Sequence, residues 1–138
     1  MIQNRRITID VDFTRNKRMF LSQISVVQRL LNNLKPCHVR VSSSKRGLHI
    51  KKFYDKILYE DEERQIYQKH CNLLEWVEEV YDDPKRRVIR EIRAKEGGLP
   101  NILFDDKSFR DISRKAGDWY VIQDALDVEI FLDFFVRI

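Results

Sequence analysis

The sequence predicts an α+β domain in which helices cover one face of an antiparallel β-sheet. Short segments of alternating apolar residues, typical of half-buried strands, recur along the chain. Two longer segments place apolar residues at three- and four-residue steps, as amphipathic helices do. With only four Gly and three Pro among 138 residues, the composition leaves little room for linkers. We therefore expect a single domain over residues 1–138.

The first half of the chain predicts a strand, a helix and two further strands. Apolar and polar residues alternate over residues 7–13, so the polar face of this strand carries Asp10 and Asp12. A helical pattern over 21–35 ends at Pro36. Further strands are expected at residues 39–42 and 48–54, with a turn at Gly47.

The second half predicts a long helix over residues 60–81, whose first turn is acidic. Residues 85–95 follow as a strongly basic helix or extended segment. A strand at 102–104, a helix at 108–116 and a terminal strand at 128–136 complete the prediction. The order βαββαβ with C-terminal additions matches a ferredoxin-like or RNA-recognition-type fold. Such a sheet leaves its helix-free face open to ligands.

The charge is distributed unevenly. The chain has a net charge of +4, but residues 1–50 hold ten Lys and Arg against two Asp, a balance of +8. A concentrated basic region favours a phosphate-bearing partner, either nucleic acid or nucleotide. The alternative is a well-solvated, lysine-rich surface without a specific partner.

The cysteines and the apolar segments indicate the compartment. Cys37 and Cys71 are isolated, so neither a zinc site nor a disulfide framework is implied. The N-terminal residues lack the apolar run of a signal peptide, and no stretch reaches the roughly 18 apolar residues of a membrane span. We expect a cytoplasmic protein with no membrane partner.

Two polar motifs lie on the predicted strands. Asp10 and Asp12 are one residue apart and share a strand face. The segment Ser44-Lys45-Arg46-Gly47-Leu48-His49 begins another strand. Carboxylates beside hydroxyl, guanidinium and imidazole groups suit a metal ion and a triphosphate. The alternative is a solvated strand face with an ordinary strand histidine.

These motifs resemble the archaeo-eukaryotic primase superfamily, and especially small primase-related proteins of archaeal viruses and plasmids. Segments 82–86 and 103–107 extend the resemblance, which covers roughly residues 5–107. Members of this superfamily polymerise nucleotides on a template with an RNA-recognition-type core. They use an acidic pair, a serine–histidine motif and a third acid.

The resemblance implies a role for each matching residue. Asp10 and Asp12 would bind Mg or Mn and, with His49, form the catalytic set. Ser44, Arg46 and His49 would contact the phosphates of a nucleoside triphosphate. The expected nucleic-acid contacts, to DNA before RNA, are Arg40, Lys45 and Lys51, together with Arg86, Arg90 and Arg93. The last three share a face at helical spacing, where they could equally form a solvated surface.

One position departs from the family pattern. Arg90 stands where the third acid is expected, and Glu91 beside it is expected to point elsewhere. Glu91, Asp105 and Asp133 are the acids that could replace it. A cation in place of a metal ligand weakens the binding of two divalent ions. The short chain also leaves little room for a second template-holding module.

We therefore expect a replication-associated protein that binds nucleic acid or nucleotide and derives from a primase–polymerase core. Two alternatives remain open. One is an active metal-dependent primase or polymerase, and the other is a non-catalytic structural or regulatory protein of a mobile element, present as a homodimer. A relaxase is disfavoured because Leu48-His49-Ile50 offers one histidine where that chemistry needs a pair.

Overall fold

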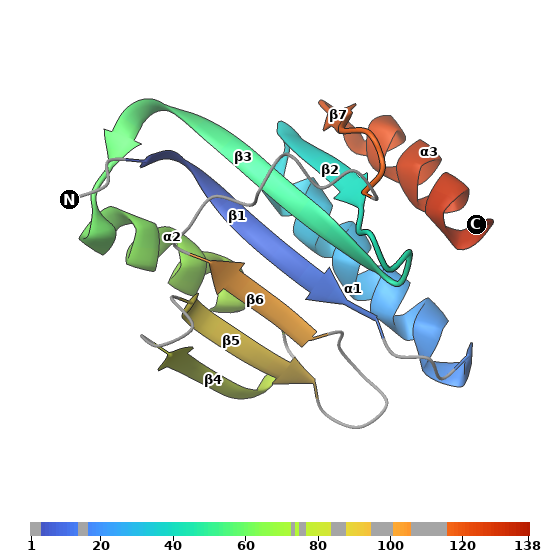
Figure 1. The fold of residues 1–138 in the computed structure, drawn as a ribbon, viewed down its shortest axis with the longest axis horizontal. Helices are drawn as coiled ribbons and strands as arrows, with labels where there is room; N and C mark the ends of the chain where they lie inside the picture. The colour runs from blue at the N-terminus through green and yellow to red at the C-terminus, as the bar shows by residue number, and fades with distance from the viewer. Residues whose placement is uncertain are drawn as a thin grey trace.

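A computed structural model describes residues 4–13, 17–72, 74, 77–83, 88–94, 101–105 and 116–138. Within these residues, strands form one seven-stranded sheet and three helices pack against it (Figure 1). The strands are β1 (Asn4–Asp12), β2 (Cys37–Val41), β3 (Gly47–Leu58), β4 (Val77–Asp83), β5 (Val88–Ala94), β6 (Asn101–Asp105) and β7 (Tyr120–Ile122). The helices are α1 (Lys17–Leu34), α2 (Glu60–Asn72) and α3 (Ala125–Val136).

The sheet has the order β4-β5-β6-β1-β3-β2-β7, and every neighbouring pair is antiparallel. Strand β3 lies between β1 and β2, as in a split βαβ unit. After α2 the chain forms the meander β4-β5-β6, which returns β6 to the free edge of β1. The predicted α+β class, with an antiparallel sheet of βαββαβ type, is confirmed.

The helices lie on one face of the sheet because the apolar side of β1 points there. Ile7, Ile9 and Val11 are fully buried on this side, and α1 and α2 run behind the strands in Figure 1. Tyr67 of α2 packs against Phe104 of β6, with ring centroids 5.1 Å apart. The opposite face of β1 carries Asp10 and Asp12, and no helix of the described part covers it.

Two expectations for the middle of the chain need correction. The helix predicted over residues 60–81 ends at Asn72, and Val77–Asp83 is the edge strand β4. The basic segment adopts the extended alternative as β5 and pairs with both β4 and β6. Residues 77–80 pair with β5 in an antiparallel ladder in place of the predicted helical hydrogen bonds, and the β-branched Val77 and Val80 favour a strand.

The predicted terminal strand is wrong, because this segment is helix α3. Asp124 caps the helix by accepting a hydrogen bond from the backbone N–H of Asp127, at 2.9 Å, and the Asp127 carboxylate accepts from the Asp124 N–H in return. The buried residues recur at helical spacing: Val128, Phe131, Leu132 and Phe135. Strand β7 was not predicted, and the helix expected at 108–116 lies outside the described residues except for Ala116.

Helix α3 continues the helix layer past the edge of β2. Phe135 contacts Phe13 and Phe20, with ring centroids 5.2 Å and 6.2 Å away. Cys37 and Cys71 are buried, and no disulfide joins them. In the part of the chain that the structure describes, no helix is long and apolar enough to cross a lipid bilayer.

Candidate functional site

The site is built on a line of residues that crosses the sheet on its helix-free face. Asp10 of β1 pairs with His49 of β3, which pairs with Arg40 of β2. On its other side, Asp10 pairs with Leu103 of β6, which pairs with Glu91 of β5. Directly opposed residues in antiparallel strands point to the same face. We call these five residues the cross-sheet row.

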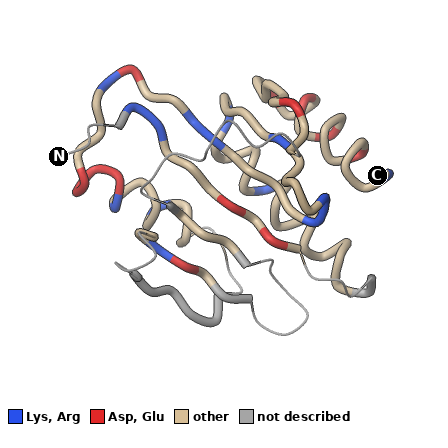
Figure 2. The backbone as a smooth tube through the Cα atoms, in the orientation of Figure 1, with Lys and Arg blue, Asp and Glu red and all other residues tan. Residues whose placement is uncertain are grey.

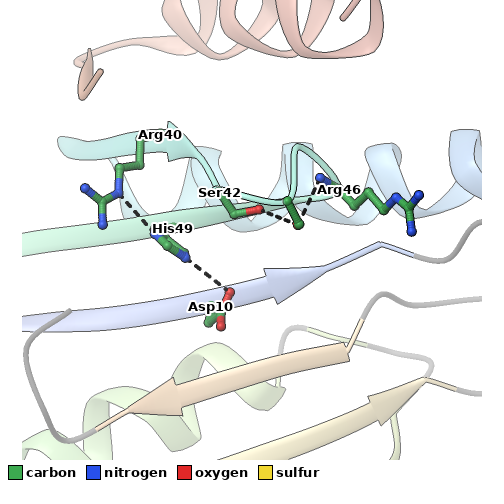
Figure 3. A network of polar contacts seen from close by, with 6 residues as sticks. Asp10, Arg40, Ser42, Arg46 and His49 are labelled. Carbon is green, nitrogen blue, oxygen red and sulfur yellow. Dashed lines mark hydrogen bonds and ion pairs between the residues drawn. The ribbon is translucent and has the colours of Figure 1, made fainter. Parts of the chain in front are cut away.

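Three members of the cross-sheet row form a chain of polar contacts (Figure 3). The Arg40 Nε donates a hydrogen bond to His49 Nδ1 at 3.0 Å, and His49 Nε2 lies 3.7 Å from Asp10 Oδ1. Because a guanidinium group only donates, Nδ1 is the acceptor nitrogen and the ring proton belongs on Nε2. Arg40 therefore directs an imidazole N–H toward the acidic strand.

His49 is neutral in this environment. Burial and, to a smaller extent, the charge of Arg40 together lower the pKa of its ring from 6.5 to about 4. The side chain of His49 is 17 % exposed and that of Asp10 is 28 % exposed, so both reach solvent. A neutral N–H beside a carboxylate can donate to a phosphate oxygen, but in this tautomer Nε2 cannot ligate a metal.

Trp119 extends the site beyond β2. Its ring lies 4.5 Å from the Arg40 guanidinium carbon and 4.0 Å from the Lys51 amine. These distances fit cation–π contacts, which hold the two cations on the helix-free face. Trp119 is not among the site residues that the sequence predicts. The only sequence signal is its place just before β7, which the prediction did not contain.

The turn from β2 to β3 presents the predicted Ser-Lys-Arg motif. Ser42 Oγ lies 3.1 Å from Ser44 Oγ, which accepts a hydrogen bond from the Arg46 backbone N–H at 3.3 Å. Lys45 has φ 61, and its N–H bonds to the carbonyl of Ser42. Residues 42–46, called the β2–β3 turn below, are thus held in shape by their own backbone and hydroxyl groups.

Gly47 lets the turn come close to the end of β1. A Cβ atom at this position would lie 2.4 Å from the Val11 carbonyl oxygen and 3.1 Å from Asp12 Oδ1. Only glycine fits such an approach without a shift of the backbone. Burial of the Asp12 carboxyl raises its pKa above the usual value. Figure 2 shows the acidic positions of β1 beside the basic β2–β3 turn.

The predicted phosphate contacts do not all converge. In Figure 3 the Arg46 guanidinium extends away from Asp10 and His49. Arg46 lies instead beside a second hollow of about 380 Å³, which Phe20 and Phe135 also line. His49, Arg40 and Lys51 gather on the sheet, so the structure divides the predicted nucleotide residues between the sheet and the turn.

The third-acid prediction needs correction in one respect. Glu91 was expected to point elsewhere, but it belongs to the cross-sheet row and shares the face of Asp10. Arg90 pairs with Phe104, whose side chain is in the core, so it belongs to the opposite face. The Arg90 Nε is buried and has no hydrogen-bond partner within the described part of the chain.

The helical face predicted for the basic segment does not exist. Because residues 88–94 form a strand, the spacing of three residues no longer places Arg90 and Arg93 on one face. Arg86 and the side chain of Arg93 lie outside the described residues. Among the residues described, no group of three or more His, Cys, Asp or Glu side chains could hold a metal ion.

Comparison of the chain with protein-family models, with curated proteins and with solved structures finds no match in any of the three. The functional argument below therefore rests on the residues and on their geometry.

Proposed function

We propose that this protein binds nucleotides or nucleic acid in DNA replication, and that it derives from a primase–polymerase core. Its helix-free face would hold phosphate groups between the acids of β1 and the cations of β2 and β3. The observation that carries this proposal is the chain Arg40–His49–Asp10, in which a buried arginine orients a neutral imidazole. The imidazole N–H is a ready donor at the boundary between opposite charges.

The charges around His49 suit a phosphate ligand that arrives with a divalent cation. A phosphate beside Asp10 and Asp12 is repelled unless a cation lies between them. Magnesium commonly takes one or two carboxylates from the protein and its remaining ligands from substrate phosphates and water. Asp10 and Asp12 fit this requirement, and Mg or Mn held there would neutralise phosphate oxygens. Arg40 and Lys51 supply positive charge on the other side.

The proposal is tested by calorimetric titration of ATP with and without magnesium. The double variant Asp10→Asn/Asp12→Asn should lose the magnesium-dependent part of the binding. The matched control, Asp55→Asn/Asp61→Asn, removes two exposed acids outside the cross-sheet row and should leave binding unchanged. Equal ATP affinity in all three proteins, with and without magnesium, would contradict the proposal.

One observation favours a second candidate, an active metal-dependent nucleotidyltransferase. Glu91 lies on the face of Asp10 with strand β6 between them, so this face offers a further carboxylate, although among the described residues no three acids group around one metal position. Template-directed extension with Mg or Mn should then give product that Asp10→Ala/Asp12→Ala abolishes. Glu91→Gln should reduce this product, while the adjacent Arg90→Gln should not. If neither metal gave product while ATP still bound, the protein would be a non-catalytic nucleotide-binding protein and the second candidate would be wrong.

A further inference from the structure

An aromatic cavity lies next to the β2–β3 turn. It encloses about 470 Å³ between the turn, residues 117–120 and helix α3. Its walls include four aromatic side chains, Trp119, Tyr120, Phe131 and Phe134. Pockets for small ligands commonly have volumes of about 300–1,000 Å³ and apolar, aromatic walls. This cavity is not part of the cross-sheet row and has no role in the function proposed above.

The aromatic cavity is held open by contacts on two sides. Gly117 donates its N–H to the Val41 carbonyl at 2.9 Å, which fixes the segment before β7 against the end of β2. Tyr120 packs against Phe131, with ring centroids 5.7 Å apart, and Phe131 packs in turn against Phe134. The aromatic walls therefore come from two segments, residues 117–120 and helix α3, which contact each other through Tyr120 and Phe131.

The polar groups of the cavity lie where it meets the β2–β3 turn. Ser42 and Lys45 line it, and the Ser42 hydroxyl is linked to Ser44. Asp118 adds a carboxylate to the lining, which can accept a hydrogen bond from an exocyclic amine. An apolar, aromatic interior with a cation and hydroxyls at one edge complements a flat heterocycle that carries phosphate.

We propose that the aromatic cavity binds the base and sugar of a nucleotide whose phosphates extend over the β2–β3 turn. Base–aromatic stacking tolerates any base, so these walls predict affinity without strong base preference. Ser42 and Lys45 line the cavity and also belong to the β2–β3 turn, over which the phosphates would extend from the cavity. The binding of the phosphates in this inference rests on the proposed function. The binding of the base rests on the cavity alone.

The test separates the two halves with three probes: adenosine, tripolyphosphate and ATP, each with magnesium. The chain has two tryptophans, so Trp76→Phe leaves Trp119 as the only one. Adenosine should change its fluorescence, and ATP should bind about tenfold more tightly than adenosine because it adds charge-assisted contacts. Saturation-transfer NMR of adenosine on the unsubstituted chain gives the same answer without any variant.

A matched pair of substitutions on α3 localises the site. Phe134 is 57 % exposed and lines the cavity, whereas Leu126 is 60 % exposed on the same helix and does not. Phe134→Ala should weaken adenosine and ATP binding by about tenfold, as the loss of one stacking partner does, and leave tripolyphosphate unaffected. Leu126→Ala should change none of the three.

The outcomes distinguish the cavity from the proposed function. Binding of tripolyphosphate without adenosine would overturn the cavity inference and leave the phosphate site standing. Binding of adenosine without tripolyphosphate would support the cavity and contradict the phosphate site. Equal losses for Phe134→Ala and Leu126→Ala would overturn the assignment of the base to this cavity.

Discussion

The two ends of the cross-sheet row share one geometry and carry opposite charge. On β2 and β3 the row contains Arg40 and the neutral ring of His49, with Lys51 nearby. On β1, β6 and β5 it contains Asp10, Leu103 and Glu91. Antiparallel pairing alone places all five side chains on one face, so the difference comes only from residue type.

This contrast explains what the face is suited to bind. A cationic or an acidic face alone would attract only one sign of charge. A face with both signs, and a neutral N–H donor between them, complements a phosphate accompanied by a divalent cation. The boundary lies at His49, which Arg40 keeps neutral and oriented.

The largest expected effect concerns the basic side. If it contacts the DNA backbone, affinity for single-stranded DNA should fall by about 20-fold between about 50 mM and 200 mM salt for three phosphate contacts. Fluorescence anisotropy measures this. Lys45→Gln/Arg46→Gln should flatten the salt dependence, whereas Lys56→Gln, whose amine pairs with Glu62, should not. If the affinity for DNA did not change with salt, the proposal that the basic side contacts the DNA backbone would be wrong.

Loss of Arg40 should weaken the binding of ATP and raise the pKa of His49. Arg40→Met removes the donor to His49 Nδ1 and one of the two cations against Trp119. ATP affinity should fall by about tenfold, in line with the loss of a hydrogen bond to a charged group. The pKa of His49 should rise, because the charge of Arg40 lowers it. Calorimetry measures the ATP affinity, and an NMR titration of the imidazole ring measures the pKa of His49. Lys56→Met is the control for both.

The contact between the β2–β3 turn and β1 can be tested with two glycines. Gly47→Ala would place a Cβ atom 2.4 Å from the Val11 carbonyl, so the free energy of unfolding should fall by about 1–3 kcal/mol. Gly117→Ala meets nothing nearer than 3.6 Å and should cost far less. Urea denaturation compares the two. Equal destabilisation would show that the close approach at Gly47 is not present in solution.

The last expected effect is a pH dependence of stability. In the folded chain, burial lowers the pKa of both His49 and His70 from 6.5 to about 4. Below pH 6.5 the unfolded chain therefore binds protons that the folded chain does not, so the free energy of unfolding falls from about pH 6.5 to about pH 4. His49→Gln should remove part of this fall, and His70→Gln another part. If the free energy of unfolding depended on pH identically in the parent chain and in both variants, the predicted role of the two histidines would be wrong.

The sequence predicted the elements that have a clear period. Residues 7–13 alternate strictly, and residues 21–35 repeat at helical steps, because one face of each is buried in the same core. Prediction failed where the apolar run is continuous. Residues 128–136 fit a buried strand or a buried helix equally well, and the capping pair Asp124 and Asp127 decided for the helix.

The sequence predicted some residues of the candidate site but not how all of its residues are arranged. Asp10, Asp12 and His49 lie on one face because β1 and β3 pair in the register that opposes Asp10 to His49. Neither the position of Glu91 nor that of Trp119 follows from local sequence. Both depend on strands that are distant in the chain, and a shift of one residue in register would turn Glu91 to the other face.

The amino-acid sequence by itself determined the fold class, the faces of β1 and α1, and the residue types available for phosphate and metal binding. These properties are local, since period and composition reflect only the neighbours of each residue along the chain. Tertiary structure alone decided that Arg40 orients His49, that Glu91 shares a face with Asp10, and that Trp119 and α3 enclose an aromatic cavity. Each of these depends on the register of strands or the packing of elements that meet only when the chain folds.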